Sequence, residues 1–385
     1  MTSRRSAFVQ EENAIARAVA ARRAAGGHLI DLTESNPTRV GLVYPADELA
    51  AAMWDTRSLV YQPAAAGLPA ARAAVAADHA RRGHRVDPEQ VVLTASTSDA
   101  YGMLFKLLCD PGDRVLVPRP SYPLFEYLAT LEGVAIDPYP LHYVAGWHID
   151  IDAVRAAITP RTRAVIVVSP NNPTGSRLAE DERAALAALG LPLIADEVFA
   201  DYAFAGARAG CDFAAAHDDV LTFSLGGLSK GAALPQLKLG WMVVAGPAAA
   251  RSDALARLHL IADTYLAVAT PVQHALPALL ALAPRLRAAV AARVQAARAE
   301  LGRACAGTAC TVLAADGGWN AVVRVPATLP EERLVLDLVH DGVLVHPGYF
   351  FDFPAESYLV VSLLPVPDEL GAGVARLLAR CARAS

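Results

Sequence analysis

Residues 164–175 read AVIVVSPNNPTG, and this stretch decides the fold. Its first five residues are apolar without alternation, which is typical of a strand buried on both faces of a sheet. The residues Asn171-Asn172-Pro173-Thr174-Gly175 then form a polar turn at the carboxyl end of that strand. Strands buried on both faces occur mainly in parallel sheets covered by helices, so the rest of the chain should alternate between strands and helices.

The sequence on either side of this stretch does alternate in that way. Short runs rich in Val, Leu and Ile are bounded by turn residues, and the longer segments between them have helical spacing. The expected strands are Val91–Thr94, Arg114–Pro118, Ala164–Ser169, Leu191–Asp196, Val220–Ser224 and Leu239–Ala245, with helices such as Ser98–Cys109 and Ala179–Leu189 between them. This pattern predicts an α/β fold with a mostly parallel, doubly wound sheet.

The pattern changes near Pro271, where a long Ala/Arg/Leu helix begins. Further along, we expect strands at Trp319–Val325, Val343–His346 and Tyr358–Leu363, and helices at Glu331–His340 and from about Asp368. This order predicts a smaller α+β domain. We therefore expect an N-terminal arm with part of the small domain at residues 1–45, a large domain at 46–275 and the small C-terminal domain at 276–385. A helix at about Phe8–Ala25 is expected either to pack with the small domain or to reach a partner subunit.

Composition excludes several classes of protein. The chain has 385 residues, a formal net charge of −5 and 54% hydrophobic residues, which is globular and lacks the clustered basic residues of a nucleic-acid-binding surface. The apolar stretch Leu276–Val290 is interrupted by Pro277, Pro284, Arg285 and Arg287, so we expect no membrane span. The five cysteines form no Cys-x-x-Cys pair, which favours reduced thiols, no metal site and a cytoplasmic location. We expect no secretory signal either.

Polar residues follow four of the expected strands at their carboxyl ends. They are Ser96-Thr97-Ser98, Asn171 to Gly175, Asp196-Glu197 and Ser229-Lys230. Open α/β sheets bind ligands beyond the carboxyl ends of their strands, so these four groups should converge. A ligand site is therefore the natural explanation for them.

Together these residues resemble the fold-type I enzymes that use pyridoxal 5′-phosphate (PLP), the class I/II aminotransferase family. The most specific motifs are Asn172-Pro173-Thr174-Gly175, Asp196-Glu197-Val198 and Ser229-Lys230, which stand in the family's order and spacing. The resemblance extends over nearly the whole chain, from Leu32-Thr33-Glu34-Ser35-Asn36-Pro37 to the last strand. It implies a PLP-dependent transferase fold and an aminotransferase activity.

The resemblance assigns roles to three residues at the centre of the site. Lys230 would hold PLP as a Schiff base and, once free, move a proton as the general acid and base. Asp196 would pair with the pyridinium nitrogen, while its neighbour Glu197 is expected to be structural. Asn172 would bind the cofactor's 3′-oxygen and approach the substrate carboxylate, although Asn-Pro is also ordinary turn chemistry.

A second group would bind the phosphate. Ser96, Thr97 and Ser98 open a helix whose free N–H groups favour an anion, although capping alone also explains them. Ser229 would join them, and Lys238 stands where the family has an arginine eight residues past the lysine. A lysine there supplies charge without the bidentate fork of an arginine.

The resemblance implies further contacts around the cofactor and the substrate. Tyr122 would stack on the pyridine ring, and Tyr61 would reach the phosphate of a neighbouring subunit, which implies a homodimer with shared sites. Ser35 and Arg39 lie in a segment that folds over the substrate, although an exposed loop position is the better explanation for Arg39. His346 also lies in a substrate-side segment, where a structural role is commoner.

Two positions depart from the family's pattern. Phe199 stands where a tyrosine commonly donates to the cofactor's 3′-oxygen, and Tyr202 nearby is not assumed to replace it. Val360 aligns with the arginine that usually binds the substrate α-carboxylate, and no arginine or lysine lies between Phe351 and Leu370. Because an unpaired buried carboxylate is costly, we expect weak binding of simple amino acids and a preference for a larger substrate.

The sequence leaves more than one reaction open. An aminotransferase would move an amino group between an amino acid and a 2-oxo acid, and an amine is an alternative donor. A PLP-dependent lyase, a β- or γ-replacement enzyme or a condensing enzyme would use the same site. A PLP-binding regulator would need a DNA-binding domain, and a dehydrogenase would need a Gly-x-Gly-x-x-Gly turn that this sequence lacks.

Overall fold

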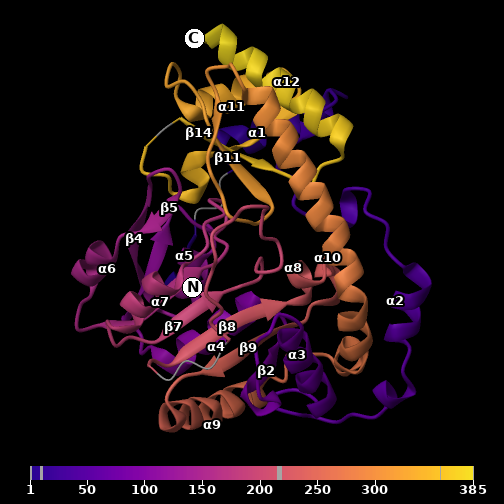
Figure 1. Ribbon diagram of the computed structural model, residues 1–385, viewed down its shortest axis with the longest axis vertical. Coiled ribbons are helices and arrows are strands. Elements are labelled where there is room, and N and C mark those ends of the chain that lie inside the picture. The colour runs from indigo at the N-terminus through magenta and orange to yellow at the C-terminus, as the bar shows by residue number, and fades with distance from the viewer. Residues whose placement is uncertain (1, 9–11, 215–218, 356, 385) are drawn as a thin grey trace.

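The computed structural model describes residues 2–8, 12–214, 219–355 and 357–384 (Figure 1). Its helices are α1 (Ala14–Ala24), α2 (Ala46–Met53), α3 (Pro69–Arg81), α4 (Thr97–Leu108), α5 (Phe125–Leu131), α6 (Ile151–Ala157), α7 (Glu180–Ala187), α8 (Leu228–Gly231), α9 (Ala248–Tyr265), α10 (Thr270–Cys305), α11 (Glu331–His340) and α12 (Pro367–Ala384). Its strands are β1 (Ile30–Asp31), β2 (Val91–Thr94), β3 (Arg114–Arg119), β4 (Ala135–Tyr143), β5 (Trp147–Ile149), β6 (Thr162–Val168), β7 (Leu193–Asp196), β8 (Thr222–Gly227), β9 (Gly240–Ala245), β10 (Thr311–Val312), β11 (Asn320–Arg324), β12 (Val343–Leu344), β13 (His346–Pro347) and β14 (Tyr358–Ser362).

The large sheet has eight strands in the order β2-β9-β8-β7-β6-β3-β4-β5. Pairing is parallel from β8 through β7, β6 and β3 to β4, whereas β9 is antiparallel to both of its neighbours and β5 is antiparallel to β4. The carboxyl ends of β2, β3, β6, β7 and β8 therefore share one edge, beyond which such sheets bind their ligands. The mostly parallel sheet that the sequence predicts is confirmed.

Helices cover both faces of this sheet. Helices α4, α5 and α9 pack on one face, where Leu104 and Leu258 lie in one apolar cluster with Phe223 of β8. On the other face α6 and α7 cover the central strands, and α3 and α10 cover β2 and β9. Every residue of β7 and β9 is buried, which explains the absence of polar alternation in their sequences.

The smaller sheet is antiparallel, with the order β10-β11-β14-β13. A separate parallel pair joins β1 near the N-terminus to β12, so the N-terminal segment lies with the C-terminal part of the chain. Figure 1 shows β11 and β14 above the large sheet, with α10 running alongside both regions. The space between the two sheets is where the polar strand ends of the large sheet point.

Three details differ from the sequence-based expectation. The run Val343–His346 is divided between β12 and β13, which pair with different partners. The β4–β5 hairpin was not expected, because Pro138 and Pro140 weaken its strand pattern, and it lies at the sheet edge where prolines are tolerated. The expected helix Phe8–Ala25 is α1 from Ala14, and its residues 9–11 lie outside the described residues.

Helix α10 is long and apolar enough to cross a membrane by length and composition. Its packing is instead that of a core helix. Leu276, Leu279 and Val290 are buried in the largest apolar cluster, and Arg287 is buried in an ion pair with Asp78 at 2.8 Å. The helix therefore serves as a spine that joins the large sheet to the C-terminal elements.

Candidate active site

A cavity of about 320 Å³ lies at the carboxyl edge of the large sheet. Residues at the ends of β7 and β8 and the first turn of α4 form one side of it. Trp319, Asn320 and His346 from the smaller sheet region form the opposite side. The cavity is thus bounded by both sheets, as the convergence of polar strand ends predicts.

Among the described residues that line this cavity, two are of the types Asp, Glu, Lys or Arg, and these are Asp196 and Lys230. Burial raises the pKa of Asp196 to about 6, against the opposing effects of the Val198 N–H at 3.2 Å, the Tyr101 hydroxyl at 3.4 Å and the Lys230 charge. Loss of hydration lowers the pKa of Lys230, and the Asp196 carboxylate opposes this. A lysine with a lowered pKa is more readily deprotonated and hence more nucleophilic.

The main chain that carries Lys230 is held by side chains from distant segments. The Tyr202 hydroxyl donates to the Lys230 carbonyl at 2.7 Å, and the Arg287 guanidinium donates to the carbonyl of the following residue. The Tyr44 hydroxyl donates to the Ala233 carbonyl, also at 2.7 Å. These three bonds, which we call the carbonyl clamp, fix the backbone while the lysine side chain extends toward the cavity.

Asn172 lies on the cavity wall after β6 and contacts the smaller sheet. The amide Nδ2 of Asn320 donates to its Oδ1 at 2.7 Å, across 148 residues of sequence. This bond occupies the carbonyl oxygen of Asn172 and leaves its Nδ2 donor for a ligand. The neighbouring Asn171 is buried and bonds Pro120 and Thr174, so it is the structural member of the pair.

The first turn of α4 lies at one end of the cavity and is suited to an anion. Ser96 caps the helix by accepting the Asp99 N–H at 3.1 Å, and the first-turn N–H groups of Thr97 and Ser98 have no partners within the helix. A Cβ on Gly240 would lie 3.1 Å from backbone atoms of Gly226 and Ser96. Glycine at this lining position therefore keeps the backbone close without obstruction.

Comparison with known proteins identifies the family. Residues 28–369 match the family model described as aminotransferase class I and II. The chain belongs to this family. An alanine aminotransferase of Mycobacterium tuberculosis (strain H37Rv) is 30% identical over 317 residues, which cover 76% of this chain and 71% of that protein. The glutamate-pyruvate aminotransferase AlaA of Escherichia coli K12 is 26% identical over 360 residues, covering 90% and 88%.

Solved structures show the same fold in other aminotransferases. An alanine aminotransferase from Pyrococcus furiosus has a TM-score of 0.89 at 24% identity, with full coverage of both chains. An aspartate aminotransferase from Thermus thermophilus has a TM-score of 0.86 at 24% identity and 99% coverage of each. The predicted PLP-dependent transferase fold and the predicted aminotransferase family are both confirmed.

The cavity of this aminotransferase fits PLP, the cofactor of its family. A helix N-terminus over a glycine suits the phosphate, and a carboxylate at the cavity wall suits a protonated ring nitrogen. Lys230 supplies the primary amine that an aldehyde requires, and the Tyr122 side chain lines the wall beside it. The donor set therefore matches an anion, a pyridine ring and an aldehyde.

The structure brings most of the predicted site residues to this one cavity. They are Ser35, Ser96, Thr97, Ser98, Tyr122, Asn172, Asp196, Ser229 and Lys230. Lys238 and Arg39 have exposed side chains that are not part of the wall, and Lys238 has a left-handed backbone with φ 49°. Tyr61 is 78% exposed and lines a separate pocket. The roles of these three residues stay predictions.

The two positions that depart from the family pattern are filled by apolar side chains. Phe199 lines the cavity and packs edge-on against Trp319, with ring centres 5.3 Å apart. The Tyr202 hydroxyl is occupied in the carbonyl clamp and does not replace the missing donor. Val360 is fully buried, and the Ser362 hydroxyl donates to the Glu34 carbonyl at 2.7 Å rather than facing the cavity.

Sequence reasoning missed three cavity residues. Tyr101 projects from α4 to Asp196, Trp319 lies with its ring centre 5.1 Å from Nζ of Lys230, and Asn320 bonds Asn172. Trp319 and Asn320 begin an expected strand, and a polar residue at a strand end was the one available hint. The segment's packing against the large sheet gives these side chains their place.

Proposed function

We propose that this aminotransferase holds PLP through Lys230 and moves an amino group between an amino acid and a 2-oxo acid. The observation that supports this best is the shared cavity of Lys230, Asp196 and Asn172, which come from three separate segments. When bound, PLP supplies an electron sink for the negative charge that develops at the substrate Cα.

The residues of this chain would divide the work among themselves. Lys230 attaches the cofactor and, when released, carries a proton between the substrate Cα and the cofactor's C4′. Asp196 would pair with the ring nitrogen, and the positive charge of a protonated ring would lower the pKa of the Asp196 carboxyl and keep it ionised. The Nδ2 group of Asn172 donates to the 3′-oxygen. The first turn of α4 and Ser229 bind the phosphate.

The remaining wall of the cavity favours an apolar substrate side chain. Phe125, Leu128, Phe350 and Phe351 line it, and no arginine lies among the described lining residues. We therefore propose a substrate larger than alanine, with weak binding of small amino acids. The names of the relatives suggest alanine and glutamate as the first small amino acids to test. Their affinities can be compared with that of a larger amino acid by following the absorbance of bound PLP.

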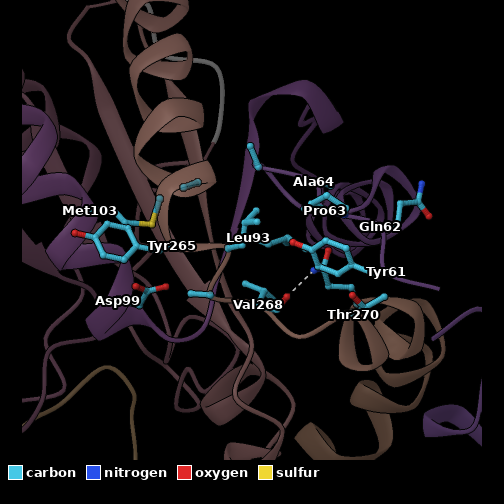
Figure 2. A pocket seen from close by; sticks show the side chains of 16 residues that line it. Tyr61, Gln62, Pro63, Ala64, Leu93, Asp99, Met103, Tyr265, Val268 and Thr270 are labelled. Atoms are coloured by element: carbon cyan, nitrogen blue, oxygen red, sulfur yellow. Dashed lines mark hydrogen bonds between the residues drawn. The ribbon is translucent and has the colours of Figure 1, made fainter. Parts of the chain in front are cut away.

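We also propose that two copies of the chain share their active sites. Large apolar side chains are exposed along the segment from Val43 to Tyr61, including Trp54 at 85% and Leu59 at 86%. Figure 2 shows Tyr61 on one side of a pocket and Tyr265 with Met103 on the other. A second copy covering this segment would bury these side chains and bring Tyr61 to its phosphate site.

The variant Lys230→Ala tests the proposal directly. We expect it to fold and to lose both the absorbance of covalently bound PLP and all turnover. Lys106→Ala, at an exposed lysine outside the cavity wall, is the matched control for folding and cofactor loading. Unchanged cofactor absorbance in Lys230→Ala would disprove the attachment.

The missing arginine at Val360 keeps a second candidate open, a PLP-dependent lyase, replacement enzyme or condensing enzyme. The discriminating experiment supplies an amino acid without a 2-oxo acid. A transaminase stops after one turnover with the cofactor in its amine form, whereas a lyase continues to release product. We expect the reaction to stop.

A further inference from the structure

A substrate amino acid brings an α-carboxylate into this cavity, and a buried carboxylate needs hydrogen-bond donors. Of the two Asp, Glu, Lys or Arg residues among the described lining residues, Asp196 repels it, and Lys230 is used first to hold the cofactor and then to move the proton. Arg119 lines the adjoining pocket but is paired with Asp352 at 3.2 Å. Among the described side chains of the wall, the candidate donors are therefore the uncharged polar ones.

The position of the usual arginine is closed in this chain. Val360 of β14 is fully buried in an apolar cluster with Val322 and Phe351. It is absent from the cavity wall, whereas Phe351 forms part of it. The space toward which a long side chain from β14 would extend is thus occupied by apolar groups.

The neighbouring strand presents a polar side chain instead. His346 of β13 is the direct antiparallel partner of Val360, and direct partners project from the same face of a sheet. Its imidazole lines the cavity that Lys230 and Asn172 also line. The Phe351 ring packs edge-on against it at 5.6 Å, and the Phe350 ring lies 6.0 Å away.

The imidazole is held in place without using its hydrogen-bonding groups. Neither ring nitrogen of His346 bonds any of the described residues, although the side chain is half-buried. Burial lowers the pKa of His346, and the negative charge of Asp31 opposes this. A substrate carboxylate beside the ring would act in the same direction as Asp31 and favour the protonated imidazole. A donor on a cavity wall that has no partner among the described residues is suited to a ligand.

We propose that His346 binds the α-carboxylate of the substrate, in place of an arginine on the last strand. The inference rests on the proposed function. Asn172 supplies the second donor. Asn320 already occupies its Oδ1, and the two hydrogens of its Nδ2 group can serve the cofactor's 3′-oxygen and the carboxylate. The substrate class is then a monocarboxylic α-amino acid with an apolar side chain, held by an imidazole and an amide.

The test compares ligands with and without the carboxylate. The PLP-loaded protein is titrated with phenylalanine and with 2-phenylethylamine, and the change in cofactor absorbance gives both affinities. We expect the wild type to prefer phenylalanine. In His346→Phe, which keeps an aromatic ring, this preference should fall about 10- to 100-fold through weaker amino-acid binding alone, as for a hydrogen bond to a charged group.

His346→Gln retains an N–H donor and should recover part of the preference. Equal weakening of both ligands in His346→Phe and His346→Gln would show a structural role and overturn the inference, as would unchanged phenylalanine affinity. A wild type with no preference for phenylalanine overturns it too. A wild type that retains no PLP, or whose absorbance responds to neither ligand, overturns the proposed function and the inference together.

Discussion

Replacing Asn320 with aspartate should change the pKa of the bound cofactor indirectly, through Asn172. Asn320 donates to Oδ1 of Asn172 at 2.7 Å and so directs the Nδ2 group of Asn172 to the ligand. An ionised aspartate cannot donate, and its charge repels the Asn172 oxygen. The side-chain amide of Asn172 should therefore flip, so that its oxygen and not its nitrogen faces the cofactor's 3′-oxygen.

The size of the effect follows from the bond that is lost. A hydrogen bond to a charged group contributes about 1.5–3 kcal/mol, and 1.36 kcal/mol corresponds to one pKa unit. Because Asn172 favours the deprotonated form of the PLP–Lys230 chromophore, its loss should raise the chromophore's pKa by about 1–2 units. A spectral pH titration of the PLP-loaded protein measures this value.

Two control variants separate positioning from other effects. Asn320→Ala removes the donor without adding charge and should give a smaller rise in the chromophore pKa. Asn172→Ala removes the Nδ2 donor without presenting an oxygen to the cofactor, so its rise should be no larger than that of Asn320→Asp. If Asn320→Asp folds, binds PLP and titrates like the wild type, then Asn320 does not position Asn172 and the reasoning fails.

Three further outcomes are expected. Phe199→Tyr places a hydroxyl near the 3′-oxygen and should lower the chromophore pKa by about half a unit to one unit, for a bond of about 0.5–1.5 kcal/mol; an equal or higher value in the spectral titration contradicts this. Co-expressed Tyr61→Ala and Lys230→Ala chains should be more active than the same two variants purified separately and mixed. In a mixed dimer, one site combines the intact Lys230 of one chain with the intact Tyr61 of the other. Activity no higher than that of the separately purified mixture argues against shared sites. Burial raises the pKa of Glu197 to about 8 from 4.5, so the folded chain binds an extra proton between these values and loses stability as pH rises. Glu197→Gln cannot ionise, and its melting temperature relative to wild type should increase from pH 5.5 to pH 8; a difference that does not change with pH refutes the assignment.

The residues that the sequence predicts well lie at the ends of parallel strands. Lys230, Asp196 and Asn172 each follow a recognisable buried strand, and the geometry of a parallel sheet brings such ends together whatever lies between them. Their convergence in one cavity needed no knowledge of side-chain packing. The same rule located the first turn of α4, because a helix that follows a strand begins at that edge.

The residues that the sequence does not predict depend on how the two sheets pack together. Asn320 and Trp319 reach the cavity from the smaller sheet region, whose orientation has no local signature in the sequence. The partnership of His346 with Val360 depends on strand register, and a shift of β13 by one residue would turn His346 to the other face of the sheet. From the sequence, Val360 could be recognised as unusual and His346 as part of a substrate-side segment, but the pairing of the two residues could not be predicted.

The carbonyl clamp has a consequence for how Lys230 can move. Tyr44, Tyr202 and Arg287 each donate to a backbone carbonyl at or just after Lys230, so the main chain there is fixed. All of the travel between attached and free lysine must come from rotations about the four methylene groups of the side chain. The distance that the amine can reach is then set by the length of the side chain from a fixed Cα. A side chain shorter by one methylene would place the amine too far away, and the backbone could not move to compensate.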